Sequence, residues 1–483
     1  MPSRLRFAVV LIALLHAACF IVYQRPDWEV AWTDQGGYKQ LGAAMARSGE
    51  FTRFPDSPTF IPEVIRTPGY PAFVAVIYRL FGVDTMPVAI AQAFVFVLIC
   101  LMVYALANRA AGPRAAAVAS IMTALFPPLP YYGALVLTEV WTTFVLIAAM
   151  LVCLRAIQTG RTRDFAIAGM LFSGATIVRP AFILLPFGLA IAMPLLVPAE
   201  RNRRRIGQWA ALALVAGITM VPWFTYNYVY LGRFTLSPAG GIGRGLWEGS
   251  WQGRWSGRAH NDLTKIAEVT PDRAELDARV REVAAREGIA PEGMLDYVHE
   301  WQDIRKIWET PTDPMERARA RVVADQEYLR AALAHIREDV GGWIKRHSTR
   351  SPLILWVSDI PVRFTDINDL PVIVIRLMWL VQAVLLAIAG AGLFVLLRRR
   401  RYSEAALLAL PLLYVTGVHI PLLVETRQSL PVKPLVIVLA AIALTALRHP
   451  GTEAPGHPGT QAPGHPGTQA PRHPITFQRS EAS

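Results

Sequence analysis

Long apolar runs alternate with short polar loops along most of this chain. Repeated runs of about 17–25 apolar residues have the length that a helix needs to cross the hydrocarbon core of a bilayer. The sequence therefore predicts an all-α polytopic membrane protein with about ten transmembrane helices. Either of the two shortest spans also fits a re-entrant helix. We place the spans at 7–23, 86–107, 114–132, 136–157, 164–180, 181–198, 207–226, 373–397, 404–424 and 430–447.

Two polar segments divide this pattern. The first follows the first span, and its stretches at 38–47 and 71–81 are too short to cross a membrane, so we predict interfacial helices there. The second is the longest polar stretch and is predicted to form a small, mainly helical extracytoplasmic domain. The expected organisation is an N-terminal membrane domain (1–226) with its first outer loop (24–85), this outer domain (227–372), C-terminal membrane helices (373–447) and a tail (448–483).

Local signals outline the outer domain. Its start is rich in Gly and Trp between Gly240 and Trp255, which we interpret as a loop with interfacial aromatics. Thr270-Pro271 opens a first helix. Asp313-Pro314-Met315-Glu316 is a good N-terminal capping arrangement, and the helix that follows should end at Gly341-Gly342. Such a helical cap shields a site, grips an acceptor or only packs on the membrane domain.

Composition agrees with a membrane protein and indicates its orientation. The 483 residues are 53% hydrophobic and 17% charged, against about 25% charged in a soluble domain. The formal net charge of +12 mostly reflects membrane orientation, because arginines gather in alternate loops, as expected for loops on the cytoplasmic side. This pattern favours a multi-pass cell (inner) membrane protein with both termini cytoplasmic over a nucleic-acid-binding protein. The basic positions are Arg4, Arg6, Arg109, Arg114, Arg155, Arg161, Arg163, Arg201, Arg203, Arg204, Arg205 and Arg398 to Arg401.

The two ends of the chain and its cysteines add little chemistry. The N-terminus has the basic start and apolar core of a signal peptide, and we interpret it as an uncleaved first span. The tail repeats His-Pro-Gly-Thr from His449; a Pro/Gly tract cannot bury a core, so a disordered cytoplasmic tail is predicted. Cys19, Cys100 and Cys153 lie in apolar runs, where a free Cys acts as a small hydrophobe.

Two carboxylates stand where the outer ends of predicted spans should lie. Asp34 follows the first span in Asp34-Gln35-Gly36-Gly37-Tyr38, and Glu139 lies at the outer end of the fourth span in Leu137-Thr138-Glu139-Val140-Trp141. An ionisable group inside or at the lip of a span, such as Glu139, is costly and is by default a functional hypothesis, whereas a carboxylate just beyond a span, such as Asp34, costs little. The plain alternatives are a solvated loop aspartate for Asp34 and a snorkelling interfacial residue for Glu139.

Cations also collect at the predicted outer span ends, where positive charge is disfavoured in short loops. Arginine binds phosphate bidentately, so an anionic lipid headgroup would stabilise such cations. For Arg363 and Arg376, salt bridges to Asp359, Asp366 or Asp369 are the alternative. The sequence contains neither an HExxH nor a P-loop pattern, so it indicates no metal or nucleotide site. The cations are Arg66, Arg179, Arg233, Arg363, Arg376, Arg427 and Lys433.

A series of short motifs runs in order along most of the chain. It comprises Asp34 with Tyr38, Arg66-Thr67-Pro68-Gly69-Tyr70-Pro71, Thr138-Glu139, Val178-Arg179-Pro180, Pro222-Trp223, Asn227-Tyr228, Gly232-Arg233-Phe234, Glu425-Thr426-Arg427 and Leu430-Pro431-Val432-Lys433-Pro434. This order resembles the polytopic GT-C glycosyltransferases, particularly the relatives of protein O-mannosyltransferases and of the bacterial lipid A aminoarabinose transferase. The chain differs from that family in having fewer spans near its end and in lacking a His-Pro pair in the insert around 255–345.

The resemblance implies an inverting glycosyltransferase that moves a hexose or pentose from a polyprenyl-phosphate donor. The acceptor would be a lipid, glycan or protein on the extracytoplasmic face. Asp34 would act as the base that activates the acceptor hydroxyl, and Glu139 as a second acidic group that orients the acceptor or a divalent ion. No cofactor is certain from the resemblance, and a divalent metal ion is left open.

The remaining site residues follow from the same resemblance. A lipid phosphate is a good leaving group, so the reaction needs cations to stabilise its growing charge more than it needs an acid. The expected donor-phosphate ligands are Arg66, Arg179, Arg427 and Lys433, and the expected substrate-binding residues are Tyr38 and Tyr70.

Two other classes are alternatives. A Wzy-like polymerase of lipid-linked glycans would have similar spans, one long outer loop and outer arginines, but would not need Asp34 or the Arg-Thr-Pro-Gly turn. A transporter would more often show internal repeats and polar residues at the membrane midplane, and the two halves of this sequence show no repeat. The glycosyltransferase is the preferred interpretation.

Overall fold

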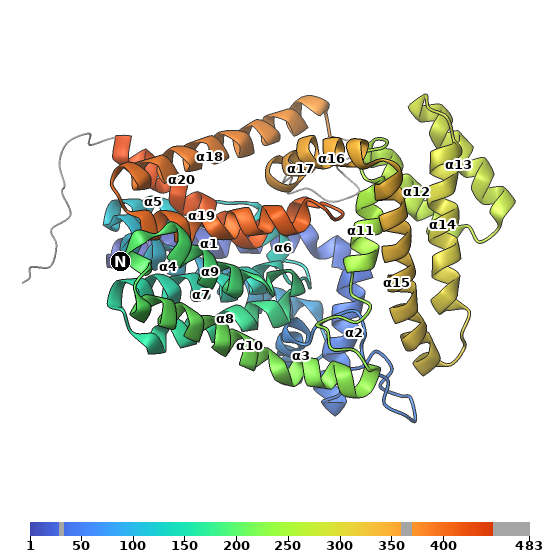
Figure 1. The fold of residues 1–483 in the computed structure, drawn as a ribbon, viewed down its shortest axis with the longest axis horizontal. Helices are drawn as coiled ribbons and strands as arrows, with labels where there is room; N and C mark the ends of the chain where they lie inside the picture. Colours follow the sequence, from blue (N-terminus) through green and yellow to red (C-terminus); the bar gives the residue numbers. More distant parts are fainter. Residues whose placement is uncertain (29–32, 359–369, 448–483) are drawn as a thin grey trace, which may run out of the picture.

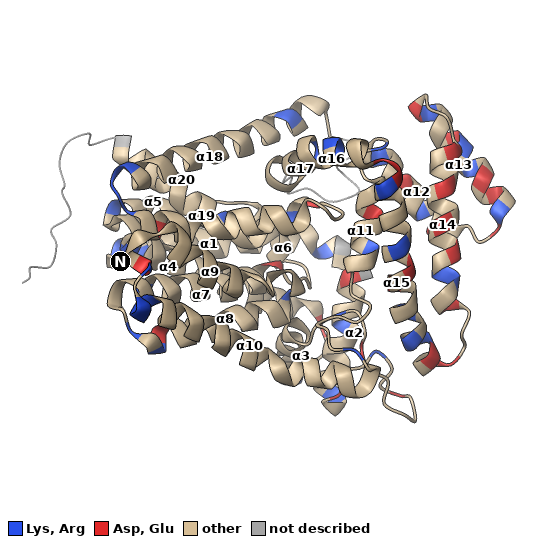
Figure 2. Ribbon diagram, viewed as in Figure 1, with Lys and Arg blue, Asp and Glu red and all other residues tan. Residues whose placement is uncertain are grey.

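One group of helices lies side by side, and a second group covers one end of the first (Figure 1). The second group carries more charged residues (Figure 2). The computed structural model describes residues 1–28, 33–358 and 370–447. Within these ranges every regular element is an α- or 3-10 helix, which confirms the predicted all-α class. The predicted tail over 448–483 and the candidate cation Arg363 lie outside the described residues.

The apolar bundle contains a helix at each predicted span. In the described part of the chain, five helices are long and apolar enough to cross a membrane: α1 (Ser3–Gln24), α4 (Thr85–Ala111), α7 (Glu139–Thr159), α10 (Arg203–Leu231) and α18 (Val372–Arg398). The others are shorter or less apolar, so the total of about ten spans stays a prediction. They are α5 (Pro113–Ala124), α8 (Thr162–Val178), α9 (Leu185–Leu196), α19 (Tyr402–His419) and α20 (Lys433–Leu447).

Prolines determine two breaks in the bundle. The continuous span predicted at 114–132 is wrong, because α5 ends at Ala124 and a separate short helix, α6 (Pro128–Gly133), follows. Proline lacks the backbone N–H of a helix and clashes with the preceding turn, so the helix does not continue through Pro127 and Pro128. The boundary between the spans predicted at 164–180 and 181–198 is confirmed: α8 ends at Val178, and the 3-10 helix η2 (Pro180–Phe182) comes next.

Charged residues are concentrated at the two ends of the bundle, and its middle is almost free of them (Figure 2). The arginine-bearing loops contact one another at the end where the N-terminus lies: an Nη2 atom of Arg401 donates to the carbonyl of Arg109 at 3.4 Å, and one of Arg204 donates to the carbonyl of Gly160 at 3.1 Å. Each of these contacts joins two of the loops that the sequence groups together. Their assignment to the cytoplasm stays a prediction.

The first polar loop forms the two short helices that its pattern predicts. They are α2 (Thr33–Ser48) and α3 (Gly69–Phe81), and a non-helical stretch joins them. This stretch connects the bundle to the outer helices, because its Ile61 and Val64 pack in one apolar cluster with Ala318 and Val322.

The second polar segment is mainly helical, as predicted. Its helix after the Asp313-Pro314 cap is confirmed, and the Asp313 carboxylate accepts from the Glu316 N–H at 2.8 Å. Its helices are α11 (Ile242–Trp251), α12 (Gly257–Val269), α13 (Arg273–Glu287), α14 (Glu292–Glu309), α15 (Pro314–Glu338), α16 (Val340–Thr349) and α17 (Ser351–Val357).

Two details of this domain were predicted wrongly. The Gly- and Trp-rich start is not an interfacial loop, because most of it forms α11, and Trp247, Trp251 and Trp255 are buried in the core of the domain. The run after the cap does not stop at Gly341-Gly342, which lie inside α16. The break comes earlier, at Asp339, whose carboxylate caps the next helix.

Candidate active site

Segments far apart in the sequence meet around one cavity of about 200 Å³. Six of the eight predicted site residues line it, and the arginines among them outnumber the carboxylates by three to two. With these groups ionised, the lining carries a net charge of +1, which suits an anionic ligand. The lining residues are Asp34, Tyr38, Ile65, Arg66, Thr67, Leu137, Thr138, Glu139, Val178, Arg179, Pro180, Gly240 and Arg427.

Helix ends place the ionised groups at the cavity. Asp34 lies in the first turn of α2, and Glu139 is the first residue of α7. Arg179 follows the last residue of α8. Carboxylates are favoured at helix N-termini and cations at C-termini, because each complements the helix dipole. The local sequence thus favours each of these charges where it stands.

The other two arginines lie outside the α-helices. Arg66 precedes α3, and its guanidinium crosses α2 at Gly37, where a Cβ would lie 2.5 Å from the Arg66 Cζ atom. A glycine is therefore needed for this close approach. Arg427 is part of the 3-10 helix η4 (Thr426–Gln428), between α19 and α20.

Asp34 is held between these two arginines. Its Oδ1 atom accepts from Nη2 of Arg66 at 3.1 Å, and its Oδ2 atom accepts from Nη2 of Arg427 at 2.9 Å. Its side chain is 40% exposed. Burial is the largest influence on the pKa of Asp34 and raises it, but the charges of Arg427 and Arg66 outweigh burial and hold the pKa below its usual value. Asp34 is consequently an ionised carboxylate with access to the cavity.

Glu139 is the buried acid of the site, with a side chain only 2% exposed. Its Oε1 atom lies 3.7 Å from Arg179 Nη1 and 3.9 Å from Arg427 Nη1, which is too far for hydrogen bonds. Glu139 Oε2 and Arg179 Nη1 are buried without a hydrogen-bond partner. Unsatisfied buried polar atoms are costly, so this pair offers hydrogen-bonding capacity to a ligand.

The structure places the predicted tyrosines one behind the other. The Tyr38 ring lines the cavity and lies 4.7 Å from the Arg66 Cζ atom, in a cation–π contact. Burial, and then the charge of Asp34, raise the pKa of Tyr38 to about 12. Tyr70 packs edge-to-face on Tyr38, is fully buried, and donates its hydroxyl to Gln92 at 3.2 Å. Tyr70 supports the site and does not line the cavity.

Lys433 is not brought to the cavity lining. It begins α20, is fully buried, and donates from Nζ to the Trp356 carbonyl at 2.8 Å and to Gln382 Oε1 at 3.2 Å. The ammonium therefore joins α20 to α17 and α18.

Two further acidic residues support the arginines and were missed as site residues. Glu63 accepts from the backbone N–H groups of Ile65 and Arg66 at 2.8 and 3.0 Å and forms a bidentate ion pair with Arg53. Glu425 accepts from Arg427 Nε at 2.6 Å. Sequence proximity to each arginine was the available signal, but proximity alone does not distinguish such carboxylates from solvated ones.

The residues of this site do not fit a divalent cation. Among the residues that the structure describes, no group of three or more His, Cys, Asp or Glu side chains could hold a metal ion. The carboxylates of the cavity face guanidinium groups, so a cation placed between them would meet the positive charges of the three arginines.

Comparison with known proteins agrees with part of this description. Residues 65–226 match the sequence profile of the family described as dolichyl-phosphate-mannose-protein mannosyltransferase. The predicted resemblance to GT-C glycosyltransferases is confirmed. The matched segment includes Arg66, Glu139 and Arg179 but neither Asp34 nor Arg427. No curated protein matches the sequence.

Two solved protein structures show a weak likeness to this chain. The oligosaccharyltransferase AglB of Archaeoglobus fulgidus, in complex with an inhibitory peptide and a dolichol-phosphate, is 14% identical, with a TM-score of 0.49 over 92% of this chain and 50% of that one. ArnT of Cupriavidus metallidurans, bound to undecaprenyl phosphate, is 15% identical, with a TM-score of 0.39 over 89% and 77%. The chain thus spans about half the length of AglB. At these scores neither likeness assigns an activity to this chain.

Proposed function

We propose that this protein is an integral-membrane, inverting glycosyltransferase that uses a polyprenyl-phosphate-linked sugar. The sugar moves to an acceptor hydroxyl on the extracytoplasmic face. The observation that carries this proposal is the shared cavity of two carboxylates and three arginines, which come from segments as far apart as Asp34 and Arg427.

The arginines bind and stabilise the phosphate. When the bond between the sugar C1 and the phosphate oxygen breaks, the bonding electrons leave with the phosphate, and its negative charge grows. Arg66, Arg179 and Arg427 are fixed cations around one cavity, and fixed charges at the place where charge develops lower the barrier. Lys433, which lies outside the lining, stabilises the packing of α20 in this proposal.

Asp34 takes the proton of the acceptor hydroxyl as its oxygen attacks C1. In the free protein this carboxylate accepts hydrogen bonds from two arginines, so it is the anion that lies between them. A donor phosphate would share those arginines. Their hold on the Asp34 carboxylate would weaken, and its pKa would rise towards the range useful for a base. Binding of the donor would thereby prepare the base.

Glu139 orients the acceptor and the arginines. It is buried beside Arg179 and Arg427, and its free Oε2 atom accepts a hydrogen bond from a ligand hydroxyl. Its Oε1 atom, 3.7 Å from Arg179 and 3.9 Å from Arg427, also helps to keep the two guanidinium groups directed into the cavity.

The test is sugar transfer or hydrolysis by the purified protein in proteoliposomes, with synthetic polyprenyl-phosphate monosaccharides as donors. We expect turnover with at least one donor, and we expect Arg66→Gln to lower it by about 100-fold. Arg233→Gln is the matched control, because Arg233 is an outer-loop arginine that does not line the cavity. Turnover of a lipid-linked oligosaccharide but of no monosaccharide donor would support a polymerase instead.

A further inference from the structure

The segment that leads to Arg427 has no regular structure of its own and depends on α11 for its position. Leu423 N–H donates to the Gly245 carbonyl of α11 at 2.7 Å. The side-chain amide of Gln252, directly after α11, forms two bonds with Val424: its Oε1 atom accepts from the Val424 N–H, and its Nε2 atom donates to the Val424 carbonyl, both at 2.9 Å. The Gln252 amide thus pairs with both backbone groups of Val424, as a neighbouring β-strand would.

A close approach of backbones makes this contact possible. A Cβ at Gly249 would lie 2.6 Å from the carbonyl carbon of Leu422 and 3.0 Å from the nitrogen of Leu423. These are backbone atoms, so a side chain at Gly249 would have to displace the segment. The glycine in α11 therefore serves this contact.

The hold continues from Val424 to the guanidinium of Arg427. Gln428 donates from Nε2 to the Leu423 carbonyl at 2.9 Å and accepts from the Glu425 N–H at 3.2 Å. Glu425 accepts from Arg427 Nε, and Arg427 Nη2 reaches Asp34. Hydrogen bonds, together with the backbone of residues 423–428, thus link α11 to the cavity.

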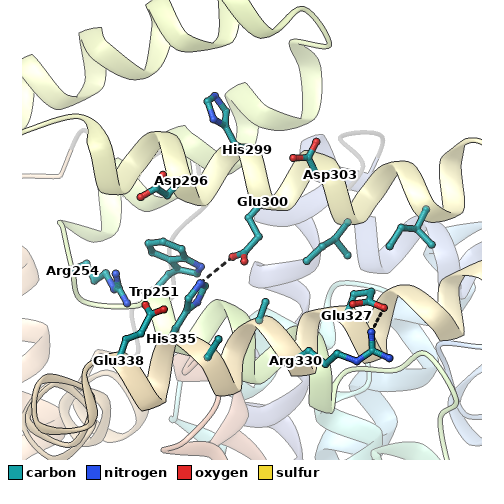
Figure 3. A pocket seen from close by; sticks show the side chains of 14 residues that line it. Trp251, Arg254, Asp296, His299, Glu300, Asp303, Glu327, Arg330, His335 and Glu338 are labelled. Atoms are coloured by element: carbon teal, nitrogen blue, oxygen red, sulfur yellow. Dashed lines mark hydrogen bonds and ion pairs between the residues drawn. The ribbon is translucent and has the colours of Figure 1, made fainter.

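The other side of α11 is anchored in the outer domain. The Trp247 indole donates to Glu300 of α14, and Ser250 Oγ lies 3.0 Å from His335 Nδ1 of α15. Figure 3 shows Trp251, Glu300 and His335 together at the groove of about 800 Å³ between α14 and α15, where His335 Nε2 lies 3.4 Å from Glu300. One face of α11 is therefore fixed to α14 and α15, and Gln252, directly after its C-terminal end, forms the two hydrogen bonds with Val424.

We propose that Gln252 is a positioning residue of the transfer reaction, which holds Arg427 at the distance from Asp34 that the donor phosphate requires. This inference rests on the proposed function. Gln252 is absent from the cavity lining, so it acts only through Arg427. Loss of the Gln252 amide would let the 422–425 segment move, and the Arg427 guanidinium would no longer be held in one position.

A double-mutant cycle separates positioning from general stability. We expect Gln252→Met to lower kcat by about tenfold in the wild-type background, because misplacement of a catalytic cation by a fraction of an ångström is enough for such a loss. In the Arg427→Gln background the same change should lower kcat by less than about twofold, since the group that it positions is gone. An equal loss in both backgrounds would overturn the inference. Gln302→Met is the control: this buried amide donates to the Thr270 carbonyl within the outer domain and should show no coupling to Arg427.

Hydrogen exchange tests the same inference without catalysis. In Gln252→Met the amide of Val424 should exchange about tenfold faster than in wild type, because it loses its acceptor, whereas Gln302→Met should leave it unchanged. If the Val424 amide exchanges faster in Gln252→Met but the wild-type protein turns over no donor, the contact between Gln252 and Val424 stands and the proposed function is rejected. Unchanged exchange at Val424 would reject the positioning role whatever the activity.

Discussion

Replacing Arg427 with Gln should reduce turnover by about two orders of magnitude. Arg427 Nη2 bonds to Asp34 at 2.9 Å, and in the proposed reaction a donor phosphate oxygen shares that contact. A hydrogen bond between charged groups contributes about 1.5–3 kcal/mol, and a fixed donor at a developing anion typically contributes 100- to 1,000-fold in kcat. The partly exposed Asp34 and Arg427 side chains, at 40% and 21%, favour the lower end of that range.

The same substitution should move the acid limb of the pH profile to higher pH. The pKa of Asp34 is held below its usual value, and the charge of Arg427 is the strongest of the effects that lower it. Asp34 must be deprotonated to act as a base, so activity in the wild type should be lost only as the pH falls below about 4. Without Arg427 the pKa of Asp34 rises, and protonation stops the reaction at a higher pH.

The assay is the pH dependence of kcat/KM for sugar transfer in proteoliposomes, for wild type, Arg427→Gln and Arg233→Gln. Arg233→Gln, the control, should retain the wild-type kcat/KM and the wild-type acid limb, since Arg233 lies outside the cavity lining. A rate for Arg427→Gln within twofold of wild type, or an acid limb that stays in place, would refute the role given to this arginine.

Three further changes give distinct expectations. Glu139→Gln should lower both kcat and the melting temperature in detergent, because Arg179, whose side chain is 16% exposed, loses the charge of its acidic partner; an unchanged melting temperature would contradict this. Glu63 has a lowered pKa, because the charge of its arginine partner outweighs the effect of burial, which raises it. The ionised Glu63 therefore stabilises the fold above about pH 4, and this stabilisation is lost as the pH falls through its folded pKa. In Glu63→Gln the melting temperature should depend less on pH over that acid range. An equal pH dependence of the melting temperature in wild type and variant would argue against this role. Gly249→Ala should lower the melting temperature and kcat together, because a Cβ would meet the Leu422 backbone at 2.6 Å, whereas Gly257→Ala, with nothing within 4 Å, should change neither.

The sequence allowed most helices to be predicted, because hydrophobic length and proline act locally. The end of α8 before Pro180 and the start of α15 after Asp313 need only neighbouring residues. The helix α11 was missed because Gly243 and Gly249 lower helix propensity. Their role is tertiary: a Cβ at Gly249 would meet the backbone of Leu422, which is far away in the sequence.

The members of the site could be proposed singly, but their assembly could not. Asp34 and Arg427 are 393 positions apart, and only the packing of α2, α7 and η4 brings them together. Lys433 was expected at the phosphate from the family resemblance and from its place near the outer end of the last predicted span. Its side chain lies instead among α17, α18 and α20, since a rotation along the start of α20 decides which neighbour an ammonium meets.

The most direct test of the central claim compares wild type with Asp34→Asn in sugar transfer and in donor binding. Asparagine keeps the shape of the side chain and removes the base, so turnover should fall by about 100- to 10,000-fold. Binding of the polyprenyl-phosphate sugar should be unchanged or tighter, because Arg66 and Arg427 no longer pair with a charge at position 34. An Asp34→Asn enzyme as active as wild type would contradict the account and leave Glu139 as the base to test.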